Sequence, residues 1–391
     1  MKTGDLSLVR KINKSIVLTK IQEEEALSRA RISEITGLNK ATVSSLVAEL
    51  IADHLVCETG LGESSGGRKP VMLYFNKSAG YSIGIDLGVN YIFGILTDLS
   101  GSIIFEYKTD LLDSHLETVL SRIIEVIQIL IKQMPPSPYG IIGIGIGVPG
   151  ITDINDNILF APNLKWENVD LKTYLEEYFN IPITVNNEAN AGAHGEKLYG
   201  AGVDIPNFVY TSIGIGIGTG IIINNELYKG ASGVSGESGH FTIHSEGLTC
   251  SCGNKGCWEL YASEKALLTM TKDLQSIKKS HEEISLEELV ELARDGNEEV
   301  LNLFHRIGEY IGIGFVNISN MFNPNAIIIG NRFSIIKEWI LEPIHRVVTE
   351  RLSRFQQVEI KFSKLGLYSS ALGSSAFAIE NFFSKLKVTV G

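Results

Sequence analysis

Cysteine is scarce in this chain of 391 residues: there are four, and three of them lie between residues 250 and 257. Small secreted proteins that depend on disulfides carry more cysteines, in even numbers along the chain. A single cluster of thiols fits a reducing compartment instead. The scarcity of cysteine elsewhere therefore excludes a disulfide-stabilised scaffold, and we expect a cytoplasmic protein.

Long apolar stretches are also lacking. The first residues do not form the apolar segment that directs secretion. The longest uncharged run, Ile205–Asn225, is long enough to cross a bilayer, but it contains Pro206, several asparagines and a glycine at every second position from 214 to 220. This pattern predicts a strand, a glycine turn and a second strand. We therefore expect neither a signal peptide nor contact with a membrane.

Basic residues are outnumbered, and the formal net charge is −11. Residues 1–80 nevertheless hold 11 basic and 9 acidic residues, whereas the remainder holds 23 basic and 36 acidic residues. A slightly basic head on an acidic body permits nucleic-acid binding by the head. The content of 44% hydrophobic and 20% charged residues is typical of a globular protein, and the length predicts two or three domains.

The first 52 residues have the periodicity of three helices. The first helix, expected over residues 8–22, has apolar positions at Val9, Ile12, Ile16 and Val17. Ser28 is suited to cap a second helix that ends at Gly37, and Asn39 is suited to cap a third. The apolar residues of the third helix follow the spacing of one buried face: Val43, Leu46, Val47, Leu50 and Ile51.

The second and third helices are joined by a short turn containing glycine, which is helix-turn-helix geometry. Strands expected near residues 55–59 and 71–75 flank a glycine-rich turn with two cations, and together they form a wing; without the wing, an ordinary three-helix core would be the alternative. The tip is suited to a narrow minor groove, where phosphates attract arginine. The predicted DNA-binding residues are Asn39, Lys40, Ala41, Thr42, Ser44, Ser45, Arg68 and Lys69.

From residue 80 the pattern changes to short strands with glycine turns. Residues 81–96 and 207–223 each predict a glycine-tipped hairpin, and further strands and helices follow each hairpin. Buried strands are expected at 141–150 and 326–330, the latter preceded by an apolar helix at 310–321. This duplication predicts an α/β body of two lobes.

Four residues are spaced like the ligands of one metal ion: His240, Cys250, Cys252 and Cys257. Three thiolates and one imidazole form the closed tetrahedral shell of a structural zinc site, so we expect one Zn²⁺ per chain. The alternative is a cluster of buried thiols in a reducing cell. A metal would fix Glu237 and Glu259 relative to each other, and two anchored carboxylates with an imidazole suit a ligand rich in hydroxyls, such as a sugar.

The segment Glu-x-Gly-His followed by Cys-x-Cys-Gly-x-x-Gly-Cys-x-Glu, at residues 237–259, resembles the signature of the ROK family of repressors, open reading frames and sugar kinases. The resemblance covers residues 5–385. It implies a two-lobed actin-like, ribonuclease-H-like body, preceded in repressor members by a winged helix-turn-helix. We expect the DNA-binding domain at 1–78, the first lobe at 79–200 and the second lobe, with the zinc motif, at 201–391.

The resemblance also implies which residues contact a sugar: Asn163, Asn187, Glu188, Glu237, His240 and Glu259. Carboxylates accept hydrogen bonds from sugar hydroxyls, and amides both donate and accept. His240 is able to ligate zinc with one nitrogen and to donate to the sugar with the other. Trp166 is expected to offer an apolar face to the sugar ring.

Phosphoryl transfer is not expected, because three positions depart from the pattern of the family's kinases. Glu188 stands where those kinases carry the aspartate base, which moves the carboxylate one methylene outward. Asn90 replaces the threonine of the first hairpin, and Asn331 follows Gly330 where a second glycine is usual. Gly218-Thr219-Gly220 is intact and has backbone N–H groups that are able to cradle phosphate, but glycine turns of this kind are also needed for structure. No catalytic residue is therefore predicted.

Together these features predict a transcriptional repressor that binds operator DNA as a homodimer and is released by a monosaccharide inducer, with xylose as the expected sugar. The wing residues 67–70 and the segment 186–190 carry this part of the resemblance. One alternative is a ROK-type sugar kinase that uses ATP and has an N-terminal helical extension. A second alternative is a sugar-sensing adaptor whose head binds protein instead of DNA.

Overall fold

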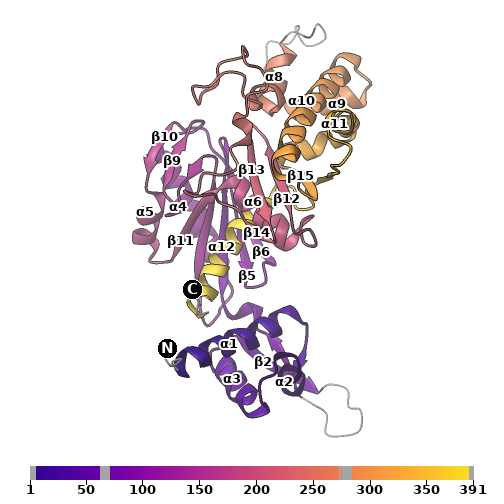
Figure 1. Cartoon of the computed structure of the whole chain (residues 1–391). Helices are drawn as coiled ribbons and strands as arrows, with labels where there is room; N and C mark the ends of the chain where they lie inside the picture. Colours follow the sequence, from indigo (N-terminus) through magenta and orange to yellow (C-terminus); the bar gives the residue numbers. More distant parts are fainter. Residues whose placement is uncertain (1–5, 62–70, 273, 275–283, 387–391) are drawn as a thin grey trace.

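The computed structural model describes residues 6–61, 71–272, 274 and 284–386, which form an N-terminal head and a two-lobed body (Figure 1). The head begins with helices α1 (Leu6–Glu23), α2 (Arg29–Thr36) and α3 (Lys40–Ala52). The side chains of Ser28 and Asn39 accept hydrogen bonds from the first turns of α2 and α3. Gly37 ends α2 with a φ of 71°. Both predicted caps and the glycine stop are confirmed.

A three-stranded antiparallel sheet completes the head, in the order β1 (Leu27–Ser28), β3 (Val71–Phe75), β2 (Val56–Leu61). The predicted hairpin is present, but its tip, with Arg68 and Lys69, lies outside the described residues. Val9 and Ile16, two of the apolar positions of the first helix, are exposed, because α1 reaches the core only with its C-terminal half, through Val17, Leu18 and Ile21.

The first lobe is built on a five-stranded sheet whose strands lie in the order β11-β7-β4-β5-β6. Its strands are β4 (Tyr81–Leu87), β5 (Tyr91–Asp98), β6 (Ile103–Asp110), β7 (Ile141–Val148) and β11 (Ile183–Asn187). Helices α4 (Leu116–Lys132) and α5 (Leu171–Phe179) and the 3₁₀ turn η1 (Lys77–Ala79) accompany it. A small sheet is formed by β8 (Ile151–Thr152), β9 (Ile158–Ala161) and β10 (Trp166–Val169).

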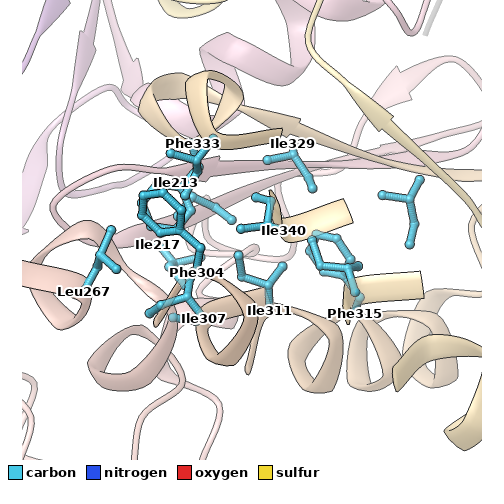
Figure 2. Close-up of a cluster of buried hydrophobic side chains, with 14 of the residues drawn as sticks. Ile213, Ile217, Leu267, Phe304, Ile307, Ile311, Phe315, Ile329, Phe333 and Ile340 are labelled. Carbon is cyan, nitrogen blue, oxygen red and sulfur yellow. The ribbon is translucent and has the colours of Figure 1, made fainter. Parts of the chain in front are cut away.

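The second lobe has a sheet of the same size, ordered β14-β13-β12-β15-β16. Its strands are β12 (Phe208–Ile213), β13 (Ile217–Ile223), β14 (Glu226–Leu227), β15 (Ala326–Gly330) and β16 (Glu359–Phe362). The helical elements are η2 (Ser238–His240), α7 (Glu259–Ala262), α8 (Glu264–Thr271), α9 (Leu286–Arg294), α10 (Glu298–Phe322), η3 (Asn331–Ile336) and α11 (Lys337–Arg351). Figure 2 shows the core of this lobe, where Phe304, Ile307 and Ile311 of α10 face Ile213, Ile217 and Ile329 of the sheet.

Two further helices, α6 (Glu188–Tyr199) and α12 (Tyr368–Leu386), pack against each other at the centre of the body. α6 contacts strands of both sheets, whereas α12 lies on β4 and β7 of the first. A Cβ at Gly145 would lie 1.8 Å from the carbonyl oxygen of Ser374, and one at Gly84 would lie 2.0 Å from that of Ala371. The glycines therefore let the helix rest directly on the strands. We propose that α12 be counted with the first lobe, although residues 201–391 were expected to form the second.

The head packs against the C-terminal end of α12. Ile379 and Phe383 are buried in the same apolar cluster as the head core, and the ring centroids of Phe75 and Phe383 are 6.1 Å apart. The hydroxyl of Tyr139 in the body donates a hydrogen bond of 2.7 Å to the backbone carbonyl of Asp53 in the head. The head is thus fastened to the body through a helix that also belongs to the body's centre.

The predicted fold class, an α/β body of two lobes behind a head of helices and a hairpin, is confirmed. Both glycine-tipped hairpins are present as β4–β5 and β12–β13. Among the residues that the structure describes, no helix has the length and hydropathy that a bilayer span requires.

Candidate metal centre and binding cleft

The four predicted metal ligands converge in the second lobe. One donor atom from each of His240, Cys250, Cys252 and Cys257 lies within 4.8 Å of the others. Cys250 Sγ is 3.6 Å from His240 Nδ1, and Cys252 Sγ is 3.7 Å from Cys257 Sγ. Donors bound to one tetrahedral zinc ion at its usual bond lengths lie roughly 3.3–3.8 Å apart. The cluster therefore fits a metal ion and is compatible with zinc.

The loop that carries the cysteines is anchored at both ends. Two isolated bridges, Thr242 to Cys257 and Thr249 to Lys255, close it on itself. Trp258 follows the last cysteine and is fully buried, with its indole N–H donating 2.7 Å to the backbone carbonyl of Tyr310. Helix α7 begins at the next residue, Glu259. The buried tryptophan therefore fixes the backbone position from which the Glu259 side chain extends.

The two predicted carboxylates flank His240. Glu259 Oε1 lies 3.6 Å from His240 Nδ1 and accepts from Cys250 Sγ at 3.1 Å. Glu237 Oε2 lies 3.8 Å from the opposite ring nitrogen, Nε2. Burial raises the pKa of Glu237, which the Glu259 carboxylate also raises and the His240 ring lowers. Nδ1 therefore faces the cysteine cluster, while Nε2 is directed toward Glu237.

All six residues that were predicted to contact a sugar line one cleft of about 860 Å³ between the lobes: Asn163, Asn187, Glu188, Glu237, His240 and Glu259. Their role as ligand contacts stays a prediction. Trp166 does not line this cleft; it is buried in the core of the first lobe and its indole N–H donates to the backbone carbonyl of Ser114. The expectation for Trp166 was wrong, because its position in β10 points it into that core. Phe160 of β9 lines the cleft.

Glu188 lies at the bottom of the cleft, at the first position of α6. Its Oε1 accepts a hydrogen bond of 3.3 Å from the Ser212 hydroxyl. Burial raises the pKa of Glu188 to about 8, helped by the neighbouring Asp86 carboxylate. Asp86 in turn accepts 2.7 Å from the Tyr91 hydroxyl, and burial raises its pKa as well. Two carboxylates thus share a poorly hydrated site, where ionising both is costly.

The glycine turns of the two hairpins also line the cleft, together with Tyr91 and Asn331. The Tyr91 ring lies against Gly88, where a Cβ would be 2.3 Å from Tyr91 Cε1. The glycine turn of the second hairpin is Gly214–Gly216, and not residues 218–220, which lie within β13. The hydroxyl of Thr219 donates a hydrogen bond to the backbone carbonyl of Gly236 and is also hydrogen-bonded to the Ser238 hydroxyl. Residues 218–220 therefore lie in a strand and not in a turn, and Gly218 is the one of the three that lines the cleft.

Several cleft residues were missed by reasoning from the sequence. Arg332 bridges Glu264, at 2.8 Å, and Glu287, at 3.0 Å, and so ties η3 to helices α8 and α9. Lys265, Arg306 and Tyr310 also line the cleft. No short motif marks these residues, because they come from three separate helical elements, η3, α8 and α10, that only the fold brings together.

The predicted DNA-facing residues lie at the start of α3. Asn39, Lys40, Ala41, Ser44 and Ser45 are exposed and Thr42 is half-buried. Asn39 also accepts 2.8 Å from the Thr42 backbone N–H as the helix cap. Arg10 of α1 donates 2.8 Å to the Ser45 hydroxyl and is paired with Glu49. This arginine was not predicted, and it adds a cation beside the exposed face of α3.

Comparisons with known proteins match both parts of the molecule. The sequence model of the ROK family matches residues 82–381. The xylose repressor of Bacillus spizizenii is 48% identical over 390 residues, covering 99% of this chain and 100% of that protein. Among solved structures, a ROK family transcriptional regulator, a homologue of the E. coli MLC protein, covers 97% of this chain and 98% of its own at 27% identity, with a TM-score of 0.82. A ROK family glucokinase from Streptomyces griseus, in complex with glucose and AMPPNP, covers 77% of this chain and 100% of its own at 29% identity, with a TM-score of 0.72.

Proposed function

The chain belongs to the ROK family, and from that premise we propose that it is a transcriptional repressor that binds operator DNA and is released by D-xylose. The observation that carries this proposal is the full-length likeness to a xylose repressor, which includes the head as well as the body. The family model begins at residue 82, so the head is an addition that a sugar kinase does not need.

The geometry of the head supports binding to DNA. An exposed helix N-terminus with Lys40, Ser44 and Ser45 follows a glycine-containing turn, and a hairpin lies beside it. A helix presented in this way fits the major groove, and a wing fits the neighbouring backbone or minor groove. We propose that two copies act together, so that the operator has two half-sites spaced by a whole number of helical turns, about 10 base pairs or a multiple.

The cleft supports binding of a monosaccharide. Its lining includes the predicted carboxylates, amides and imidazole as well as further polar side chains, which suits a small ligand with several hydroxyls. We propose that a structural Zn²⁺ on His240 and the three cysteines holds Glu237 and Glu259 in place around that ligand. A site built from hydrogen-bonding groups discriminates strongly among sugars, because a missing hydroxyl leaves buried groups unpaired.

Helix α12 offers a route from the cleft to the head. Its first turn carries Ser370, which lines a small cavity together with Asp86 and Glu188, and its last turns carry Ile379 and Phe383, which pack on the head. We propose that sugar binding closes the lobes and changes how the two heads of a dimer are spaced. An inducer releases DNA only if it binds the DNA-incompetent state more tightly, and a coupling of roughly 1–3 kcal/mol is sufficient.

Replacing Lys40 or Arg68 by alanine should weaken operator binding and leave xylose affinity unchanged. Each lost phosphate contact should reduce the slope of log affinity against log salt by about 0.9. The measurement is a mobility-shift titration at several salt concentrations, with an inverted-repeat operator that the parent protein selects from random DNA. Lys132→Ala is the matched control, because Lys132 is an exposed lysine at the C-terminal end of α4 in the body. If Lys40→Ala and Arg68→Ala both bind like the parent, the head does not bind DNA as a winged helix, and the adaptor alternative gains support.

The parent protein should release no ADP above background when it is incubated with xylose and ATP. Glu188→Asp should restore little turnover. The Tyr91 ring still lies against Gly88 in this variant, and Asn331 still donates its hydrogen bond to Ser212. A coupled assay of ADP formation measures this for both proteins. Turnover of the parent near about 1 per second, the low end for ordinary enzymes, would favour the kinase alternative.

A further inference from the structure

Ser212 and Asn331 form a hydrogen-bonded pair next to Glu188. Asn331 Nδ2 lies 3.1 Å from Ser212 Oγ, and Ser212 Oγ lies 3.3 Å from Glu188 Oε1. An amide nitrogen only donates, so the Ser212 oxygen accepts from Asn331 and keeps its own hydrogen for the carboxylate. The hydrogen bonds therefore run in one direction, from Asn331 through Ser212 to Glu188.

The backbone holds this pair in place. Ser212 lies near the end of β12, opposite Gly330 of β15, and its exposed fraction is 4%. Asn331 follows with a φ of 64°, a conformation that asparagine adopts more readily than most residues. A Cβ at Gly214 would lie 3.1 Å from Asn331 Nδ2, so glycine there leaves room for the amide. The pair belongs to the second lobe, whereas Glu188 begins the central helix α6.

The hydrogen bond from Ser212 affects the protonation of Glu188, because the surroundings of this carboxylate disfavour its charge. Asp86 from β4, Tyr91 from β5 and Tyr210 from β12 are the titratable groups around it. Burial and the Asp86 charge disfavour the ionised carboxylate, and the hydrogen bond from Ser212 favours it. Ser212 is thus a neighbour that favours the ionised form of Glu188, which accepts hydrogen bonds.

We propose that Ser212 and Asn331 are positioning residues for the inducer. They hold Oε1 of Glu188 and leave Oε2, which has no hydrogen bond among the described residues, to accept from a sugar hydroxyl. This inference rests on the proposed function, because it assigns the partners of the same sugar site. It also gives Asn331 a positive role: the side chain that stands where a second glycine is usual supports Glu188 through Ser212.

The test is calorimetric titration of full-length protein with D-xylose between pH 6.5 and 9. Ser212→Ala should weaken xylose about tenfold, the effect of losing one hydrogen bond to a charged group. Asn331→Gly removes the amide without straining the positive φ, and it should weaken xylose by a smaller factor of roughly 3. Asn331→Asp should bind at least as weakly as Ser212→Ala, since an aspartate draws the Ser212 hydrogen away from Glu188.

The pH profile separates positioning from a general structural effect. Xylose affinity of the parent should rise as the pH increases through the raised pKa of Glu188, because the ionised form is the acceptor. Loss of the Ser212 hydrogen bond raises that pKa further, so the rise should move to higher pH in Ser212→Ala. Thr211→Val is the control, because it deletes a hydroxyl without a hydrogen-bond partner from the same strand.

The outcomes are distinguishable. If the parent binds xylose and the Ser212 and Asn331 variants match it in affinity and pH profile, the positioning role is overturned. If Thr211→Val weakens xylose as much as Ser212→Ala does, the effect is structural and the proposal also fails. A parent that binds operator DNA but no xylose would instead contradict the proposed inducer. Should Ser212→Ala fail to fold, the two Asn331 variants decide the question by the same criteria.

Discussion

Glu188→Ala and Glu259→Ala should each abolish induction by xylose while operator binding persists. Both carboxylates line the cleft, Glu188 at the start of α6 and Glu259 at the start of α7. Each substitution therefore removes the hydrogen-bond acceptors that one helix presents to the bound sugar. Two lost hydrogen bonds to a charged group should weaken xylose on the order of 100-fold. The expected result is a repressor that stays on its operator at sugar concentrations that release the parent.

The measurement combines xylose titration by calorimetry with operator release in a mobility-shift assay. Glu167→Ala is the matched control, because Glu167 is an exposed glutamate of β10 that does not line the cleft. Release of DNA from Glu188→Ala at the parent's xylose concentration would show that the inducer binds elsewhere. Loss of operator binding in the absence of sugar would instead show that the variant damages the fold.

Cys252→Ser should remove the metal and weaken the sugar response together. Cys252 is exposed, so its replacement leaves the apolar core intact, but the tetrahedral shell loses one of its four donors. Without the metal, His240 and the loop to Cys257 lose their common anchor, and Glu237 and Glu259 are no longer held on either side of the imidazole. We expect about one zinc per chain in the parent, and a large loss of metal content in Cys252→Ser.

Metal content is measured by elemental analysis of purified protein, and xylose affinity by calorimetry on the same preparations. Cys57→Ser is the matched control, because Cys57 is the cysteine outside the cluster and lies in β2 of the head. Parent protein that holds no metal yet responds fully to xylose would refute the role assigned to the cluster. Loss of metal without any loss of xylose affinity would leave a zinc site that does not position the carboxylates.

The cleft of this chain combines polar side chains beside the cysteine cluster with close contacts around Gly88 and Asn331. On one side, His240, Glu237 and Glu259 lie beside the cysteine cluster. On the other side, Tyr91 packs on Gly88 and donates to Asp86, and Asn331 donates to Ser212. In our proposal, sugar recognition is kept, whereas the contacts of Tyr91 and Asn331 disfavour phosphoryl transfer.

The sequence by itself determined the local features. The caps Ser28 and Asn39 and the stop at Gly37 depend on residues a few positions apart, and spacing alone predicts them. The four metal ligands lie within 18 residues, so their convergence required only a short loop. The two glycine-tipped hairpins and the α/β class followed from patterns of the same range.

The predictions from sequence differ from the structure where packing between distant segments determines the position of a side chain. Trp166 points into the first-lobe core and Thr219 lies inside a strand, and neither fact is visible from neighbouring residues. Only the tertiary structure showed that α12 returns to the first sheet. The need for glycine at 84 and 145 is explained by the close approach of the α12 backbone, which the sequence does not reveal. The contact of Asn331 with Ser212 spans 119 residues and arises because β12 and β15 are neighbours in one sheet. Local hydrogen bonds are set by chain connectivity, whereas these contacts depend on which surfaces the whole fold brings together.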